Sequence, residues 1–253
     1  MRRSLVLAAL CAAVSVQVAS AADMPTKAPA YAPVAPIAMY NWTGFYVGGQ
    51  VGGGWARNQV TNVDGNVNFP PGFVSNTINS SGFLGGGYAG YNYQINQFVI
   101  GIDGDYSWAS LTGSGTDTGP TGFTSTKNDK FKWVATLTGR LGYAVNNWLF
   151  FGKGGWAWAG FNATSSSFNV AGANVSNGTN STTRNGWTLG TGVEWGFARN
   201  WAAKLEYDYV RFNTANYNAT DTSVLPVPGI VTTPARSATS SLNMVKLGVA
   251  YRF

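Results

Sequence analysis

Two acidic residues, Asp103 and Asp105, have a spacing that could support acid–base chemistry. Residues two apart on a β-strand point to the same side, about 7 Å apart, as a pair of hydrolytic carboxylates would require. The chain has no histidine, and its single cysteine, Cys11, lies in an N-terminal segment that we expect to be removed. A Ser-His-Asp triad and a cysteine nucleophile are therefore excluded, and a transition-metal site is disfavoured.

A second motif, Gly85, Gly87 and Gly90, spells G-x-G-x-x-G. A dinucleotide site needs a helix after these glycines, but residues 91–94 continue a strand pattern, so nucleotide binding is not expected. The simpler interpretation of the acidic pair is that lysine and arginine on neighbouring strands neutralise it. We expect no catalytic residue, no cofactor and no metal site.

The composition excludes several classes of protein. Only 10% of the 253 residues are charged, against about 25% in ordinary domains. A disordered chain would not carry 14% aromatic residues, and no run of 18 apolar residues is present to form a membrane helix. Loss of Arg2 and Arg3 with the N-terminal segment would lower the net charge from +6 to +4, which is too small to indicate a nucleic-acid partner. Many aromatic residues must therefore lie at a surface or an interface.

The N-terminal segment has the organisation of a secretory signal. Arg2 and Arg3 precede an apolar run over 5–16, and Ala19 and Ala21 form a small-x-small cleavage site, so residues 1–21 are predicted to be removed. Residues 22–40 combine four prolines with many alanines, which is typical of an extended tail in the periplasm.

From residue 41 onwards, apolar and polar residues alternate in stretches of about ten, separated by polar segments that hold the remaining prolines. Three short connections alternate with four long ones, as periplasmic turns and extracellular loops do in outer-membrane barrels. The sequence therefore predicts an all-β fold, an eight-stranded antiparallel transmembrane β-barrel over 41–253. The expected strands are 44–55, 82–93, 98–109, 131–144, 148–160, 186–196, 201–212 and 242–253.

Charged residues inside these strands fall on the face opposite the apolar one. The interior of an eight-stranded barrel is about wide enough for side chains to fill, so a packed ionic network is expected rather than a wide pore. Aromatic residues at both strand ends predict two girdles at the membrane interfaces. The predicted lumen network consists of Asp103, Asp105, Lys132, Arg140, Lys153, Glu194, Lys204, Glu206, Asp208, Lys246 and Arg252.

Four segments resemble one family: NWTGFYVGG (41–49), GYNYQ (90–94), GIDGDY (101–106) and VKLGVAYRF (245–253). They are similar to the small porin-like outer-membrane β-barrels of alphaproteobacteria, the surface antigens called Omp25 and Omp31. The resemblance implies secretion to the periplasm and insertion into the outer membrane of a Gram-negative cell. The last strand resembles the signal read by the barrel-assembly machinery, through Lys246, Gly248, Tyr251 and Phe253.

Cleavage after Ala21 would expose Ala22 and Asp23, which resemble the start of alphaproteobacterial barrels that are joined to peptidoglycan. A free flexible tail is the equally weighted alternative. The outer-membrane lipid and its lipopolysaccharide are expected partners, and no nucleic acid is expected. The sequence does not determine the oligomeric state.

Three functions remain open: a structural barrel that stabilises the membrane, a narrow porin for small solutes, and a surface receptor or adhesin that uses the loops. The predicted loops have only two more cations than carboxylates, which is too weak an excess to indicate a receptor, so a hydrated crown contacting lipopolysaccharide phosphates is favoured. The cations are Arg57, Lys127, Lys130, Arg184, Arg211 and Arg236, and the carboxylates are Asp64, Asp117, Asp129 and Asp221.

Overall fold

The computed structural model describes residues 40–62, 71–72, 74, 77–119, 122–218, 221–222, 231–232 and 235–253. The predicted signal, Ala22, Asp23 and the rest of 1–39 lie outside the described residues. Among the described residues, no helix is long and apolar enough to cross a membrane.

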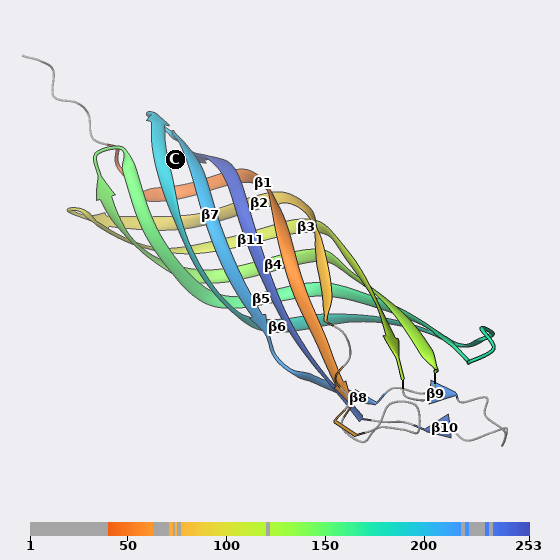
Figure 1. The fold of residues 1–253 in the computed structure, drawn as a ribbon. Helices are drawn as coiled ribbons and strands as arrows, with labels where there is room; N and C mark the ends of the chain where they lie inside the picture. The colour runs from red at the N-terminus through yellow and green to blue at the C-terminus, as the bar shows by residue number, and fades with distance from the viewer. Residues whose placement is uncertain are drawn as a thin grey trace, which may run out of the picture. The chain divides into compact units, whose positions relative to one another are not determined.

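The described chain folds as one antiparallel sheet that closes on itself (Figure 1). Each long strand pairs with its neighbour in sequence, and β1 pairs with both β2 and β11, which completes the ring. The predicted eight-stranded barrel is confirmed. Its strands are β1 (Gly44–Asn62), β2 (Ile78–Ile95), β3 (Phe98–Thr118), β4 (Thr124–Val145), β5 (Trp148–Phe168), β6 (Asn174–Ala198), β7 (Trp201–Phe212) and β11 (Ala235–Arg252).

Three short strands complete the fold. β8 (Ala215–Asn218) pairs with β11 just beyond the end of β7, and β9 (Asp221–Thr222) pairs with β10 (Val231–Thr232) as a separate two-stranded sheet.

At one end of the barrel the strands join through tight turns, which we call the short-turn end. Asn96 and Asn146 lie in the turns that follow β2 and β4, with φ angles of 55° and 53°. Asparagine tolerates this left-handed conformation better than other non-glycine residues, so it suits a hairpin turn. Two of the three predicted short connections therefore have the residue that the turn geometry requires.

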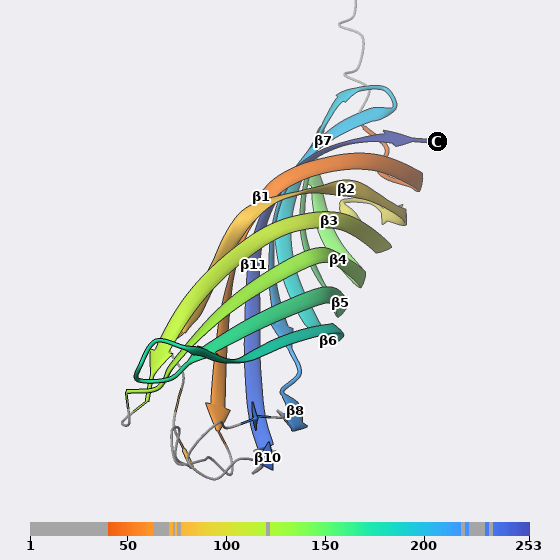
Figure 2. The same cartoon turned by 90° about the vertical axis from the view of Figure 1, so that its right-hand side faces the viewer.

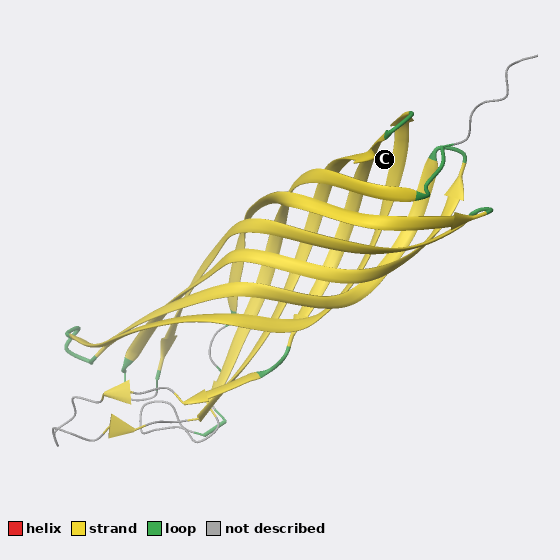
Figure 3. Ribbon diagram, turned by 180° about the vertical axis from the view of Figure 1, so that it is seen from behind, coloured by secondary structure: helices red, strands yellow, loops and turns green. Residues whose placement is uncertain are grey.

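At the opposite end the strands continue well beyond their predicted limits, and we call this the long-arm end (Figure 2). β3 and β4 stay paired as far as Thr118 and Thr124, and β5 and β6 as far as Phe168 and Asn174. Most of the predicted loops 110–130 and 161–185 is therefore a pair of hairpin arms (Figure 3). Both faces of these arms are polar and rich in serine and threonine, so they lack the alternation that marks a membrane strand.

The outer face of the barrel is apolar, and aromatic pairs lie near both ends of the strands. Trp148 and Trp195 stack across β5 and β6 next to the short turns, with ring centroids 5.8 Å apart. Tyr106 and Trp133 stack at 6.0 Å towards the long arms. Such cross-strand pairs hold neighbouring strands in register and place amphipathic rings at the membrane interfaces.

Gly86 marks a place where two strands approach too closely for any side chain. A Cβ atom there would lie 1.9 Å from the carbonyl oxygen of Tyr106 and 2.7 Å from Cα of Ser107. At Gly139, by contrast, no atom lies within 4 Å of the position that a Cβ would take, so a methyl group is accommodated.

We expect the substitution Gly86→Ala to lower the free energy of unfolding by roughly 1–3 kcal/mol, because the β2–β3 backbone must shift. Gly139→Ala is the matched control and should leave stability unchanged or raise it by about 0.4–1 kcal/mol. Urea unfolding of the purified barrel in detergent, followed by tryptophan fluorescence, measures both. Equal stability of the two variants would contradict the close approach at Gly86.

Candidate functional site

The lumen of the barrel contains a belt of buried charged side chains. Among the described residues, five cations and five carboxylates from six strands point inward at this level, so the belt is neutral. They are Asp103 and Asp105 on β3, Arg140 on β4, Lys153 on β5, Glu194 on β6, Lys204, Glu206 and Asp208 on β7, and Lys246 and Arg252 on β11.

Two lysines form the centre of this ionic belt. Nζ of Lys246 lies 2.6 Å from Asp208, 2.8 Å from Glu206 and 3.3 Å from Asp105. Nζ of Lys153 lies 2.8 Å from the same Glu206 oxygen and 3.5 Å from Asp208. Each ammonium group is thus shared among several carboxylates, which offsets the cost of removing these charges from water.

A second group of contacts lies around Arg140. Its guanidinium is 2.9 Å from Glu194 and donates a 3.1 Å hydrogen bond to the Tyr46 hydroxyl, which in turn donates to Asp103 at 2.7 Å. The same guanidinium lies 4.0 Å from the ring centre of Phe151. Aromatic faces therefore supply part of the solvation that the buried cations lose.

The candidate acid–base pair is part of this belt. Asp105 accepts a hydrogen bond from the Thr136 hydroxyl, and Lys153 lies 3.6 Å from Asp103 and 3.7 Å from Asp105. Carboxylate oxygens of Asp105, Glu206 and Asp208 lie within 4.8 Å of one another, close enough to hold a metal ion. The ammonium groups of the two central lysines contact the same three carboxylates, and Lys204 lies 3.0 Å from Glu206, so three cations already neutralise this arrangement.

An apolar layer, which we call the upper plug, lies inside the barrel on the long-arm side of the belt. Phe131 is its centre, with ring centroids 5.1 Å from Phe161 and 5.9 Å from Phe212. These three rings come from β4, β5 and β7, so they meet across the lumen. The upper plug consists of Ala56, Leu84, Ala109, Leu111, Phe131, Val134, Ala157, Ala159, Phe161, Val210, Phe212, Leu242 and Met244.

A smaller apolar layer, which we call the lower plug, lies on the short-turn side. It consists of Tyr40, Trp42, Val99, Ala144, Leu149 and Ala202. Trp42 is 0% exposed; its backbone N–H donates to the Gln94 side chain at 2.9 Å, and its carbonyl accepts from Arg252. Tyr40, which the sequence assigns to the tail, packs on Trp42 with ring centroids 4.5 Å apart. Burial raises the pKa of the Tyr40 hydroxyl, although Arg252 opposes the shift.

Lys132 is a correction to the predicted network, because its side chain is exposed on the outside of the barrel. The pairing of β4 with β5 shifts between Phe131 and Trp133, which is the mark of a β-bulge. The extra residue reverses the alternation, so Phe131 points into the lumen and Lys132 out of it. The predicted excess of one cation in the lumen disappears with this change.

Beyond the upper plug, the arms enclose a polar layer, where the sequence predicts only hydrated loops. The Asn58 amide donates to Asp129 at 2.9 Å, and Arg184 donates to the Ser240 hydroxyl at 2.7 Å. Asp129 is buried inside the arms, and this burial raises the pKa of its carboxyl against the opposing hydrogen bond from Asn58. Buried and exposed residues still alternate along parts of the arms, but both faces are polar, so the sequence carries no signal for these inward positions.

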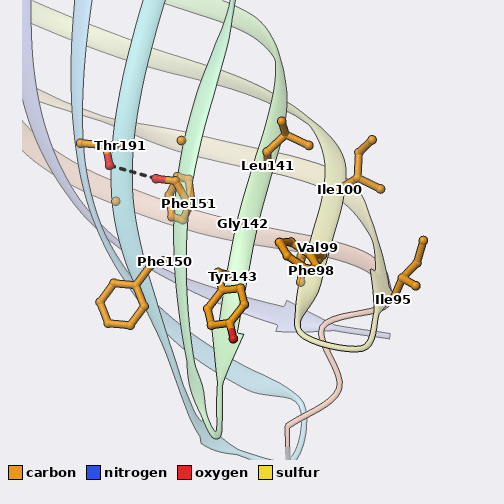
Figure 4. A pocket seen from close by; sticks show the side chains of 12 residues that line it. Ile95, Phe98, Val99, Ile100, Leu141, Gly142, Tyr143, Phe150, Phe151 and Thr191 are labelled. Carbon is orange, nitrogen blue, oxygen red and sulfur yellow. Dashed lines mark hydrogen bonds between the residues drawn. The ribbon is translucent and has the colours of Figure 1, made fainter.

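An apolar hollow of about 710 Å³ lies on the side of the barrel near the short turns, between β3 and β6 (Figure 4). Leu141, Tyr143 and Phe150 are among its exposed side chains, and Thr191 closes one edge by donating to the Phe151 carbonyl at 3.0 Å. The exposed side chains that line this hollow are apolar, as on a surface that contacts lipid acyl chains.

The C-terminal residues of the predicted assembly signal lie in different surroundings. Lys246 is buried in the ionic belt, and a Cβ at Gly248 would lie 2.9 Å from the Tyr88 ring. Tyr251 packs against Trp201 at 5.3 Å, and Phe253 is 74% exposed at the rim, where its N–H donates to the Phe45 carbonyl at 2.9 Å.

We expect Lys246→Met to lower the free energy of unfolding by about 3–5 kcal/mol, because it leaves three buried carboxylates without one of their two shared cations. Lys132→Met removes the same charge from the outer face and should change it by no more than about 0.5 kcal/mol. Urea unfolding in detergent compares the two variants with the parent. A Lys246 variant as stable as the parent would show that the belt does not hold the barrel together.

The chain matches the family model of the outer membrane protein beta-barrel domain over residues 5–253. It is 31% identical over 258 residues to the 31 kDa outer-membrane immunogenic protein of Brucella melitensis, covering 99% of this chain and 100% of that protein. The 22 kDa outer membrane protein of Rhizobium leguminosarum bv. viciae is 29% identical, over 88% of this chain and 82% of its own. The crystal structure of the outer membrane protein OprG from Pseudomonas aeruginosa, with 10% identity, a TM-score of 0.50 and coverage of 85% and 99%, has a similar fold. The chain therefore belongs to the outer membrane protein β-barrel family, among the Omp25/Omp31 surface antigens, and is a protein of the outer membrane.

Proposed function

We propose that this barrel is a closed, non-catalytic structural element that stabilises the outer membrane. The observation that carries the proposal is the layered lumen, in which a neutral ionic belt lies between two apolar plugs. In outer-membrane barrels the short turns face the periplasm and the long connections face outward, so the lower plug is periplasmic and the upper plug extracellular.

Glycines on the inner face are the feature that favours a narrow porin, because they could leave gaps. Aromatic and apolar side chains fill the space beside them. A Cβ at Gly48 would lie 2.5 Å from the Tyr88 ring, and one at Gly90 would lie 2.3 Å from the Tyr46 hydroxyl. The ring atoms occupy the volume that a solute path would need, which supports the closed barrel.

The contacts of the acidic residues support a role without catalysis. Asp103 and Asp105 are buried and shared with Lys153, Lys246 and Tyr46, so neither is available to a substrate from the surface. In this proposal the ion pairs serve to hold six strands of the barrel together rather than to move protons.

The proposal includes three partners that act on different parts of the chain. The barrel-assembly machinery would read the last strand, where Tyr251 and Phe253 lie on the outside of the barrel at its short-turn end. Lipopolysaccharide would contact the outer surface near the arms. Attachment of Ala22 to peptidoglycan would anchor the barrel to the cell wall, and mass spectrometry of lysozyme-released protein tests this by the presence or absence of a muropeptide on that residue.

We expect the purified protein to give no steady conductance steps in planar lipid bilayers, since both plugs and the belt must move before ions can pass. A known porin inserted under the same conditions is the positive control. Cells that lack the protein should be more sensitive to detergent, and the parent chain should restore resistance. Steady single-channel steps would contradict the closed lumen, and unchanged detergent resistance would contradict the structural role.

A second candidate, a surface receptor or adhesin, is favoured by one observation, the length of the paired arms. A β-ladder with one register shift, between Ser167 and Phe168, pairs the two strands of the β5–β6 arm as far as its tip, at Phe168 and Asn174, so its polar side chains have fixed positions. A stiff, exposed and polar hairpin can present a binding surface with little loss of conformational entropy on binding.

Removal of the outer part of this arm tests the second candidate. Thr164 pairs with Thr179, so residues 165–178 can be replaced by an Asn-Gly turn without changing the register below. If the arm binds host surfaces, adherence of intact cells to cultured host cells should fall several-fold while detergent resistance stays unchanged. Unchanged adherence would remove the receptor role of this arm.

A further inference from the structure

The exposed charges on the described part of the barrel are all of one sign. The structure describes seven carboxylate side chains, and all seven are buried, including Asp117 and Asp129 inside the arms. The exposed charged side chains among the described residues are the cations Arg57, Lys130, Lys132, Arg199 and Arg211. The sequence does not show this separation, because cations and carboxylates are mixed along the predicted loops.

Two of these cations lie in one row across the sheet. Arg57 on β1 pairs with Ser241 on β11, and Ser241 pairs with Arg211 on β7. The three strands lie side by side (Figures 1 and 2), so the two arginines are two strand spacings apart, about 10 Å. Their chain neighbours on both sides are buried, so both side chains point outward.

Aromatic rings form a shelf at this row and on its membrane side: Trp187 pairs with Arg211, and Trp55, Tyr207 and Tyr209 lie two to four residues nearer the short-turn end. Trp55 and Tyr207 have ring centroids 6.5 Å apart, and Trp187 and Tyr209 have centroids 5.7 Å apart. The Tyr207 hydroxyl donates to Asn243 at 2.7 Å, which fixes its ring. Tryptophan and tyrosine belts lie at the level of the lipid head groups. The two arginines are therefore at the height where the phosphates of outer-leaflet lipid lie.

We propose that Arg57 and Arg211, with the aromatic shelf beside them, form a binding site for lipopolysaccharide through the phosphates of its lipid A part. Guanidinium groups bind phosphate through two parallel hydrogen bonds, and the Ser241 hydroxyl lies between them. The aromatic rings pack against the sugars and the first part of the acyl chains. The inference rests on the proposed structural role and names the lipid through which the barrel is held in the outer leaflet.

Charge complementarity favours this occupant. The row and its neighbours expose cations, and no described carboxylate is exposed to repel an anionic lipid. Lys130 and Lys132 have the same charge but lie on β4 and follow one another along a single strand. They are a matched comparison, because substituting either pair removes two positive charges from the outer face.

The test uses the full-length mature protein in detergent and measures the dissociation constant for lipid A by native mass spectrometry. The variant R57Q/R211Q should bind lipid A roughly 30-fold more weakly than the parent, since each basic residue near a lipid surface contributes about 1 kcal/mol. For K130Q/K132Q, the change in the logarithm of the dissociation constant should be less than about a third of the change for R57Q/R211Q. R57K/R211K keeps the charge and should bind with intermediate affinity.

Three outcomes would overturn the assignment. Equal losses in the two double glutamine variants would indicate general attraction to a cationic surface. Equal binding of dephosphorylated lipid A would exclude recognition through phosphate, and equally tight binding of phosphatidylglycerol would indicate a site for any anionic lipid. Heat-modifiable mobility on gels shows whether each variant is folded. Conductance is measured separately, so a conducting barrel that keeps this lipid specificity would refute the closed lumen and leave the lipid site standing.

Discussion

Neutralisation of charge inside a closed sheet is the constraint on which the rest of this structure depends. Lipid covers the outer face, so charged residues within the membrane-spanning part must point inward, and an eight-stranded ring leaves them no room for bulk water. Each buried cation then needs a buried carboxylate, as Lys246 has in Asp208 and Glu206. The apolar plugs belong to the same solution, because apolar side chains on both sides of the belt lower the local dielectric constant and so strengthen the ion pairs between them. A wider ring would relax all these requirements together.

The same alternation explains how far the sequence predicts this fold. Period-two patterning identifies the membrane-spanning part of every long strand, and it places ten of the predicted lumen charges on the buried face. Lys132 escapes the rule because a bulge at Phe131 adds one residue, and a single added residue exchanges the two faces. The arms escape for a different reason. Above the membrane the outer face of a strand contacts water and the inner face contacts a polar interior that contains Asp129, so Ser165 and its neighbours need no apolar partner and resemble a loop in sequence.

The plugs show the limit of hydropathy as a guide to sidedness. Leu149 and Phe151 are buried in the lumen, although their side chains are as apolar as those of Phe150 and Leu141 on the lipid face. The alternation along β5 shows which of these apolar residues face the lumen. Leu149 and Phe151 share a face with Lys153, and a lysine at mid-membrane must be inside. Trp42 lies before the first strand, so the alternation of strand residues does not show which way its side chain points. Only the three-dimensional structure locates it in the lumen.

Segregation of charge follows from what each face of the barrel contacts. Inside, either sign is acceptable provided that its partner is present, and five of each are found among the described residues. Outside, the signs are not equivalent if the surrounding lipid is anionic, because a carboxylate beside Arg57 would repel the head groups that the arginine attracts. Burial of Asp117 and Asp129 within the arms removes that repulsion and supplies the arm interior with hydrogen-bond acceptors. One pattern of alternation therefore serves both requirements: it neutralises the lumen and leaves the outer surface cationic at the height of the lipid phosphates.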